Sequence, residues 1–485
     1  MGLPAWQQGD LPHPPVLTMR NDVRVIGPGT IPLGLSLGAG DWLLGPAIVV
    51  KHGPAILWVC TLSVILQALL NTEMARYTLA TGESIYTGFM RTPPGPRFWA
   101  RTYAVLHLIQ LGWPGWAAAG GSALAALALG RMPRGEDHHV VLAFGYFVFL
   151  ASVGIALLGA RAQQRIERAE WLMMGWMFGF LLLVGILLVP SDVWVRVAAG
   201  FISPLVGPTT LPAEVDWVLL AAFAAYSGAG GVINATLTQW LRDKGFGMAG
   251  TVGGTPGTIG GEPTRRPREG AIFPATEANM AKWQQWWRYL RADLWFLWTP
   301  GCLIGMALPV LLAVAFIRPD TDMGGPGAAA VLARALGRQH IALWLLALLT
   351  GFWILFATQV GITAGFARSV TDILWTSGVR PGNSATTGSA NTLYGSTLAV
   401  FALAGCGAMA VAEPLSLILI GANLAAVNLV ILAFHTLWVN RRLLPPGLRP
   451  SLWRKAAVAV GGLFFGLLVA RVAARPAQLL ALFGG

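Results

Sequence analysis

The stretch Pro32-Leu-Gly-Leu-Ser-Leu-Gly38-Ala-Gly-Asp41-Trp-Leu-Leu-Gly-Pro46 places several glycines and one acid inside an apolar segment. A second apolar segment has the same kind of interruption at Ala224-Ala-Tyr-Ser227-Gly228-Ala-Gly-Gly-Val-Ile-Asn234. An unpaired backbone amide or carbonyl is costly in lipid, so a spanning helix is broken only where the freed groups line a polar cavity. A corresponding pair of breaks in two halves of a chain predicts the substrate site of a transporter.

The composition predicts an all-α integral membrane protein. Hydrophobic residues make up 55% of the chain and charged residues 11%, and the mean hydropathy is +0.62. A soluble domain carries about 25% charged residues. Apolar stretches long enough to cross a hydrocarbon core of roughly 30 Å are expected at eleven places in the sequence: 28–51, 54–80, 102–129, 139–160, 171–190, 215–241, 293–317, 341–375, 393–412, 414–438 and 455–474.

Charge distribution predicts the orientation. The N-terminus has no cationic region followed by an apolar run, so we do not expect a cleaved signal peptide. Most of the 33 Lys and Arg residues fall in segments on the side of residue 1. The positive-inside rule therefore predicts a multi-pass protein of the cell membrane with a cytoplasmic N-terminus. The net charge of +12 is explained by this topology and by anionic lipid rather than by nucleic acid.

The order of the spans predicts two units of opposite orientation. After a cytoplasmic tail (1–27), we expect a first five-helix repeat (28–190), a second (191–438), and a loop with accessory helix 11 (439–485). Five spans per unit invert the second unit relative to the first. The glycine-rich stretch 242–291 is predicted as a flexible cytoplasmic linker ending in an interfacial helix.

Asp41 is the leading candidate site residue, because an intramembrane carboxylate is a functional-site hypothesis by default. With unwound carbonyls near Ser36–Gly40 and Ala224–Gly228, it could supply oxygen ligands for a cation. It could also carry a proton or pair with an ammonium group. Alternatively, it caps the outer half-helix.

Other polar side chains at membrane depth suit several roles. Asn234 follows the second break and offers an amide oxygen. Candidates for gating or coupling, each of which could instead be structural, are His107, Gln359, Arg368, Asn423 and Asn428. Cys60, Cys302 and Cys406 lie in separate apolar stretches and are interpreted as packing residues. No catalytic motif is present in the sequence, so we do not expect an enzyme.

Several segments, taken in order, resemble the Nramp family of divalent-metal transporters. The segments that carry the resemblance are Gly27-Pro28-Gly29, Gly38-Ala-Gly-Asp41-Trp42, Gly53-Pro-Ala-Ile-Leu-Trp58, Ala75-Arg76-Tyr-Thr-Leu-Ala80-Thr81-Gly82, Gly121-Ser122-Ala123, Arg165-Ile-Glu167, Thr236-Leu-Thr-Gln239 and Ala364-Gly365. The resemblance implies the leucine-transporter-like fold, with a 5+5 inverted repeat, broken helices 1 and 6, and about 11 transmembrane helices.

The chain departs from the family pattern at the site. Where the family has Asp-Pro-Gly-Asn, this sequence has Gly38-Ala-Gly-Asp41, so the ligand Asp is replaced by Gly38 and the ligand Asn by Asp41. The family's Met-Pro-His corresponds to Ser227-Gly228-Ala229, which removes the thioether that favours soft metals. The family's third-helix acids, linked to proton movement, fall near Gly115 and Ala118.

These residues together predict a secondary transporter that moves a hard divalent cation, Mg²⁺ or Mn²⁺, by alternating access. The predicted substrate-binding residues are Gly38, Asp41, Ala224, Ser227, Gly228 and Asn234, with Asp41 as the metal ligand. We expect no permanently bound cofactor, and proton coupling stays open. The expected partners are the lipid bilayer and a small ion or solute. The alternatives are a transporter of a small organic solute and a non-transporting membrane sensor.

Overall fold

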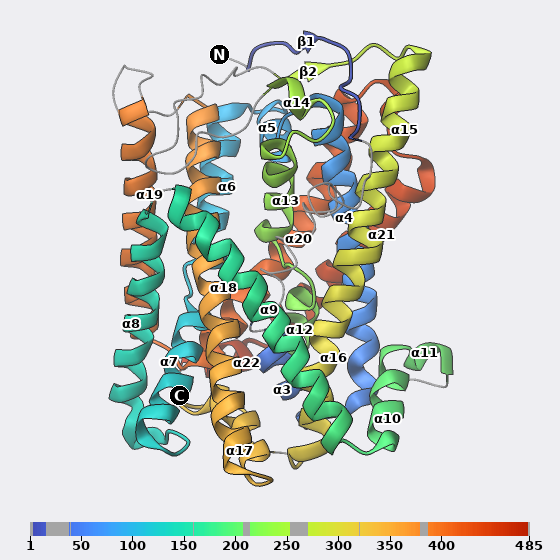
Figure 1. The fold of residues 1–485 in the computed structure, drawn as a ribbon. Coiled ribbons are helices and arrows are strands. Elements are labelled where there is room, and N and C mark those ends of the chain that lie inside the picture. The colour runs from blue at the N-terminus through green and yellow to red at the C-terminus, as the bar shows by residue number, and fades with distance from the viewer. Residues whose placement is uncertain are drawn as a thin grey trace.

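A computed structural model describes residues 3–15, 38, 40–158, 160–206, 214–252, 270–319, 321–378 and 387–483. Most of its long helices run side by side, and β1, β2, α5 and α14 lie at one end (Figure 1). We call this the N-terminal end, because residues 3–15 lie there. Within the described ranges, seven helices are long and apolar enough to cross a membrane, and three shorter apolar helices accompany them. The prediction of a multi-pass helical membrane protein is confirmed.

The first half of the chain follows the predicted spans. Its elements are β1 (Gln7–Gln8), η1 (Gly40–Leu44), α3 (Gly45–His52), η2 (Pro54–Leu57), α4 (Trp58–Thr81), α5 (Ile85–Met90), α6 (Pro96–Leu111), α7 (Gly115–Leu129), η3 (Gly135–Asp137), α8 (His138–Leu157) and α9 (Ala160–Leu188). Residues 28–37 of the first predicted span lie outside the described ranges. The predicted span 102–129 is two helices, because Pro114 has no N–H to continue the hydrogen-bond ladder of α6.

The second half contains the second broken helix and the remaining spans. Its elements are α10 (Ser191–Phe201), α11 (Ser203–Val206), α12 (Trp217–Tyr226), α13 (Val232–Asp243), α14 (Ala249–Val252), β2 (Ala271–Ile272), α15 (Glu277–Ala292), η4 (Asp293–Trp298), α16 (Thr299–Phe316), η5 (Ala328–Ala330), α17 (Val331–Gly337), α18 (Ile341–Thr376), α19 (Thr387–Met409), α20 (Pro414–Leu443), η6 (Pro446–Leu448), α21 (Leu452–Ala473), α22 (Pro476–Leu480) and η7 (Ala481–Phe483).

The prediction of a flexible linker over 242–291 is wrong for residues 270–291. β2 pairs in parallel with β1, with Gln7 opposite Ala271, and α15 continues through η4 into α16. Glu277–Phe316 is therefore one helix of 40 residues, visible as the long yellow helix of Figure 1. The aromatic and basic residues of 283–291 are helical as expected. They belong to α15, however, which extends a spanning helix instead of forming a separate interfacial helix. Residues 253–269 of the linker lie outside the described ranges.

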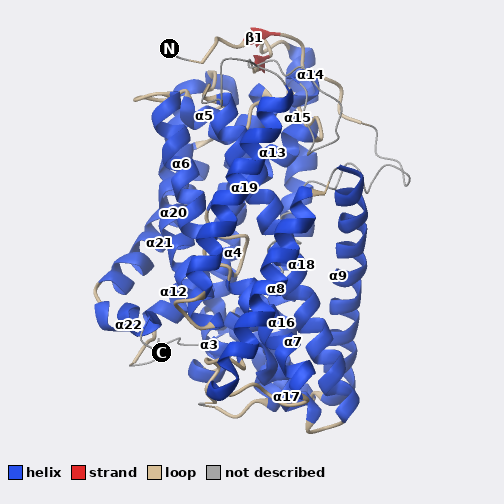
Figure 2. Ribbon diagram, turned by 90° about the vertical axis from the view of Figure 1, so that its left-hand side faces the viewer, coloured by secondary structure: helices blue, strands red, loops and turns tan. Residues whose placement is uncertain are grey.

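The helices divide into a core group and a peripheral group. α4 packs against both halves of the second broken helix, α12 and α13, and α3 packs against α16. In contrast, α9 runs along one side of the bundle (Figure 2), and large apolar side chains such as Leu187 on this helix are exposed. Exposed apolar side chains on peripheral helices are suited to contact with lipid tails. The N-terminal strand β1 lies at the top of the bundle and α22 lies in its lower half (Figure 1).

Candidate functional site

Asp41 lies at the first break with a buried and unpaired carboxylate. The residue is 4% exposed, and neither carboxylate oxygen has a hydrogen-bond partner among the described residues. The capping alternative is not formed, since α3 has Leu44 at its N-cap and no side-chain cap hydrogen bond. Burying an unpaired carboxylate is costly unless a cation or a proton compensates its charge. Asp41 is therefore the side chain most in need of a ligand.

The two helix breaks touch each other beside Asp41. A Cβ added to Gly40 would lie 2.3 Å from the Tyr226 carbonyl oxygen at the end of α12. A Cβ on Gly38 would lie 2.8 Å from Oγ1 of Thr358 on α18. Real Cβ atoms do not approach other atoms so closely, so Gly40 requires glycine against the Tyr226 backbone, whereas at Gly38 the crowding comes from the Thr358 side chain. A side chain at position 38 would therefore require the Thr358 side chain to move in this arrangement.

A glutamine on α4 joins the two sides of the second break. Gln67 donates from Nε2 to the carbonyl of Ala225 over 3.1 Å, and to that of Ala224 over 3.4 Å. Its Oε1 accepts from the Gly230 amide over 3.1 Å. Ser63 donates its hydroxyl proton to the Ala224 carbonyl. The carbonyls of Ala224 and Ala225, expected to be free for a cation, are therefore hydrogen-bonded in this structure.

A second glutamine, on α6, holds the far side of the same break. Gln110 donates from Nε2 to the Gly230 carbonyl over 3.0 Å and accepts from the Val232 amide over 3.0 Å. Asn428 on α20 fixes it by donating to the same Oε1 over 2.8 Å. Gly231 has a positive φ of 56°, and a Cβ there would lie 2.1 Å from Gln110 Oε1. The two glutamines thus form hydrogen bonds with several of the backbone amides and carbonyls that have no helical partner at the interruption.

The remaining residues of the predicted site lie along the second broken helix. The Ser227 hydroxyl donates to the Phe223 carbonyl over 2.6 Å. A Cβ on Gly228 would lie 2.6 Å from Gln67 Oε1. Asn234 donates to Asn71 on α4 over 2.9 Å, so its contact is one turn beyond the break.

The other predicted polar residues connect helices. His107 has Nδ1 at 2.7 Å from the Tyr103 carbonyl and Nε2 at 3.1 Å from the Tyr86 hydroxyl, which favours its structural interpretation. Gln359 accepts from the Ala117 amide in the first turn of α7 over 3.2 Å. Asn423 donates to the Val218 carbonyl on α12 over 3.0 Å.

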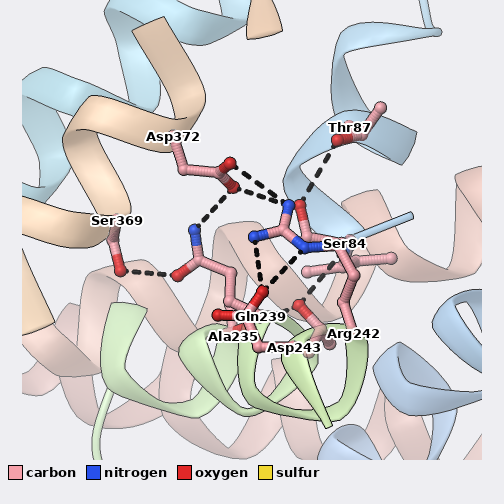
Figure 3. Close-up of polar contacts among 10 residues, drawn as sticks. Ser84, Thr87, Ala235, Gln239, Arg242, Asp243, Ser369 and Asp372 are labelled. Carbon is pink, nitrogen blue, oxygen red and sulfur yellow. Dashed lines mark hydrogen bonds and ion pairs between the residues drawn. The ribbon is translucent and has the colours of Figure 1, made fainter. Parts of the chain in front are cut away.

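A polar network closes the bundle between α13 and α18 toward the N-terminal end (Figure 3). Arg242 donates to Asp372 over 2.9 Å, and Gln239 donates to the same carboxylate over 3.0 Å. Ser369 donates to Gln239 Oε1 over 2.6 Å. Asp372 thus forms an ion pair with Arg242. Arg368, a predicted gating or coupling residue, lies over the Trp240 ring at 4.2 Å.

The segment 3–15 crosses the N-terminal end of the bundle as a strap. Leu11 is fully buried, and its amide donates to Asn279 Oδ1 on α15 over 3.2 Å. Trp286 on the same helix donates from Nε1 to the Pro12 carbonyl over 3.0 Å. Arg91 donates to the Pro4 carbonyl over 2.6 Å. The strap therefore links α15 to the region between α5 and α6.

Comparisons with known proteins give the fold. No family model matches the chain, and no curated protein matches it. Solved structures of a manganese transporter from Eremococcus coleocola do match. One point variant has 15% identity and a TM-score of 0.66 over 97% of this chain and 90% of that chain. A complex with an aromatic bis-isothiourea substituted compound has 14% identity and a TM-score of 0.64, covering 94% and 88%.

These matches place the chain among multi-pass membrane proteins with the fold of that manganese transporter. The predicted leucine-transporter-like fold is confirmed. The predicted sixth helix is broken between α12 and α13, whereas the part of the first helix before residue 38 lies outside the described ranges. The matched proteins are named as transporters rather than enzymes.

Proposed function

We propose that this protein is a Nramp-related secondary transporter of the cell membrane that moves a divalent metal cation, with Asp41 as the principal cation ligand. The observation that carries the proposal is the buried, unpaired carboxylate of Asp41 at the contact between two helix breaks. A cation beside Asp41 would supply the charge that burial otherwise leaves uncompensated. Oxygen donors of this kind suit Mg²⁺ and Mn²⁺.

In this proposal, the cation crosses the membrane by alternating access. The Arg242–Asp372 pair and the strap close the N-terminal end, which we assign to the cytoplasm from the excess of Lys and Arg on that side. Separation of α13 from α18 would open a path from Asp41 to that side. Helix breaks are suited to this motion because each half-helix can tilt independently.

The organic-solute alternative has less support from the second break. A substrate carboxylate would need free amides at the ends of the half-helices. The amides of Gly230, two residues before α13, and of Val232, its first residue, are both hydrogen-bonded to glutamine side chains. A substrate amine, which would pair with Asp41 directly, is still compatible with this geometry.

The test is flux into liposomes that contain the full-length protein. We expect uptake of Mn²⁺ or Mg²⁺, and its loss in Asp41→Asn, which keeps the shape of the side chain and removes its charge. The matched control is Asp192→Asn, a 69% exposed acid on α10 that pairs with Arg196 and should leave flux unchanged. Repeating the assay with a pH gradient determines whether protons drive the cation.

Uptake of an amine or an amino acid without any divalent flux would overturn the metal assignment. Saturable binding without any flux would instead support a membrane sensor.

A further inference from the structure

An ion cluster near the end of α4 that leads to α5 joins α4 to α21, and its charges do not balance. Glu73 on α4 accepts two hydrogen bonds from Arg76, from Nε over 2.7 Å and from Nη2 over 3.2 Å. The same carboxylate accepts from Nη1 of Arg454 on α21 over 3.1 Å. The side chains of Glu73, Arg76 and Arg454 are only 1%, 8% and 11% exposed. One carboxylate therefore faces two guanidinium groups, which leaves an excess of positive charge.

The Arg454 guanidinium is held in place with one edge unused. It lies over the ring of Trp287 on α15 at 5.1 Å and over that of Trp453 at 4.5 Å. Arg76 lies over the same Trp287 ring at 4.1 Å. The Nε and Nη2 atoms of Arg454 have no hydrogen-bond partner among the described residues. Two parallel N–H groups on one edge of a guanidinium match the oxygens of a phosphate. Arg454 is therefore positioned to bind an anion of this kind.

The segments around this cluster add positive charge and no exposed acid. Lys455 follows Arg454 on α21, and Arg291 lies one turn after Trp287 on α15. Neither Lys455 nor Arg291 forms an ion pair with a described residue. The stretches 281–292 and 438–458 contain no Asp or Glu, and the next acid after α15, Asp293, is buried. Exposed basic residues on the same stretches are Arg288, Arg441, Arg442 and Arg449. A surface of this charge attracts an anionic partner.

Apolar side chains beside the cluster favour a lipid as that partner. Leu452 is 81% exposed and Trp453 is 58% exposed at the start of α21, which is one of the helices able to cross a membrane. Further along the helix, Val460, Leu463 and Leu467 are also exposed. Tryptophan and basic residues are typical of the interface between lipid headgroups and acyl chains. A phospholipid contacts both the charged and the apolar part of this surface, whereas a soluble anion contacts only the charged part.

We propose that Arg454, with Lys455 and Arg291, binds the phosphate of an anionic phospholipid in the leaflet at the N-terminal end. The lipid supplies the negative charge that Glu73 alone does not, and it holds the accessory helix α21 against α4 and α15. Phosphatidylcholine fits this surface less well, because its choline group would bring a further positive charge to the cluster. The proposed lipid site lies outside the Asp41 site and does not depend on which cation is transported.

Native mass spectrometry of the full-length protein in detergent counts bound lipids directly. The protein is titrated with phosphatidylglycerol and, separately, with phosphatidylcholine that has the same acyl chains. We expect the first phosphatidylglycerol to bind at least roughly fivefold more tightly than phosphatidylcholine, which is the contribution of one basic residue near an anionic lipid surface.

Variants of the basic residues locate the site. The double variant Arg291→Gln/Lys455→Gln removes two cations without breaking an ion pair among the described residues. Its affinity for phosphatidylglycerol should fall roughly fivefold for each charge removed. Arg454→Lys keeps the charge but loses the paired N–H groups, so its affinity should also fall. The matched control is Arg101→Gln, an exposed residue on α6, which packs on α5, α18 and α20. This control should bind phosphatidylglycerol as the wild type does.

A thermal melt gives a second readout and shows that each variant is folded. Phosphatidylglycerol should raise the unfolding temperature of the wild type and of Arg101→Gln more than that of the double variant. Equal binding of the two lipids, or wild-type affinity in the double variant, would overturn the lipid site. Inorganic phosphate that displaces phosphatidylglycerol and raises the unfolding temperature by itself would assign the cluster to a soluble anion and also overturn it. Phosphatidylglycerol binding at this site without flux of any divalent ion would refute the proposed function alone.

Discussion

Gln67 accepts a hydrogen bond from the amide of Gly230 over 3.1 Å, and its own amide group donates to carbonyls on the other side of the same helix break. One side chain thus bridges the interruption between α12 and α13. A spanning helix can be broken in a membrane only if the freed groups find partners. Here two glutamines supply several of those partners, and Gln67 bonds both to α12 and to Gly230, just before α13 begins.

Replacing Gln67 with alanine should destabilise the protein, because backbone groups at the break between α12 and α13 would lose their hydrogen-bond partners. The Ala225 carbonyl and the Gly230 amide would each lose a partner, at about 1–3 kcal/mol for each unsatisfied buried group. We expect a lower unfolding temperature and a loss of metal flux, measured by a thermal melt and by liposome uptake. Gln284→Ala, which removes an exposed glutamine from α15, is the control and should change neither quantity. An unchanged unfolding temperature in Gln67→Ala would show that water replaces the hydrogen bonds of Gln67.

Metal binding should stabilise the wild-type protein through Asp41. A ligand that binds the folded state alone adds about 2.7 kcal/mol at a concentration of 100 times its dissociation constant. We expect Mn²⁺ or Cd²⁺ to raise the unfolding temperature of the wild-type protein and to have no such effect on Asp41→Asn. Without metal, Asp41→Asn should unfold at a higher temperature than the wild type, because it removes an unpaired buried charge. Equal metal-dependent shifts in both proteins would place the metal elsewhere.

Weakening the Arg242–Asp372 pair should open the N-terminal end. Asp372→Asn removes the charge from one partner while keeping its size, and a hydrogen bond to a charged group contributes about 1.5–3 kcal/mol. We expect the open population to rise roughly tenfold or more, which corresponds to 1.4 kcal/mol or more. Hydrogen exchange of the α13 amides should accelerate accordingly.

The exposed pair Arg196–Asp192 provides the control for this experiment, since surface pairs contribute little. Asp192→Asn should leave exchange in α13 unchanged. Slow exchange in Asp372→Asn would mean that Gln239 and the neighbouring contacts hold α13 and α18 together without the charge.

The sequence reveals the acid at the first break more readily than the side chains that form hydrogen bonds with the backbone of the second break. Asp41 stands out as an acid within a run of glycines, so its role can be predicted from local pattern. Gln67 and Gln110 are isolated polar residues in apolar helices, and the direction they face depends on packing. One signal was available: Ser63, Gln67 and Asn71 repeat every four residues and form a polar stripe on α4. Such a stripe predicts that this face of the helix meets backbone groups or a site.

The linker shows a different limit. The order in residues 270–291 comes from the segment 3–15, more than 250 residues away in the chain, and composition does not predict such pairing.

The strap should be able to detach from the N-terminal end without unfolding of the helices. Leu11 is fully buried against the bundle, and truncating a buried leucine to alanine costs about 2–5 kcal/mol. Because this residue lies at the edge of the protein, Leu11→Ala should release the strap locally instead of unfolding the helices. We expect faster hydrogen exchange in the β1–β2 pair and at the start of α15, with little change in the unfolding temperature. His13→Ala, at an exposed position of the same strap, is the matched control. If hydrogen exchange accelerates across all the spanning helices in Leu11→Ala, the strap unfolds only together with the helices and does not detach separately.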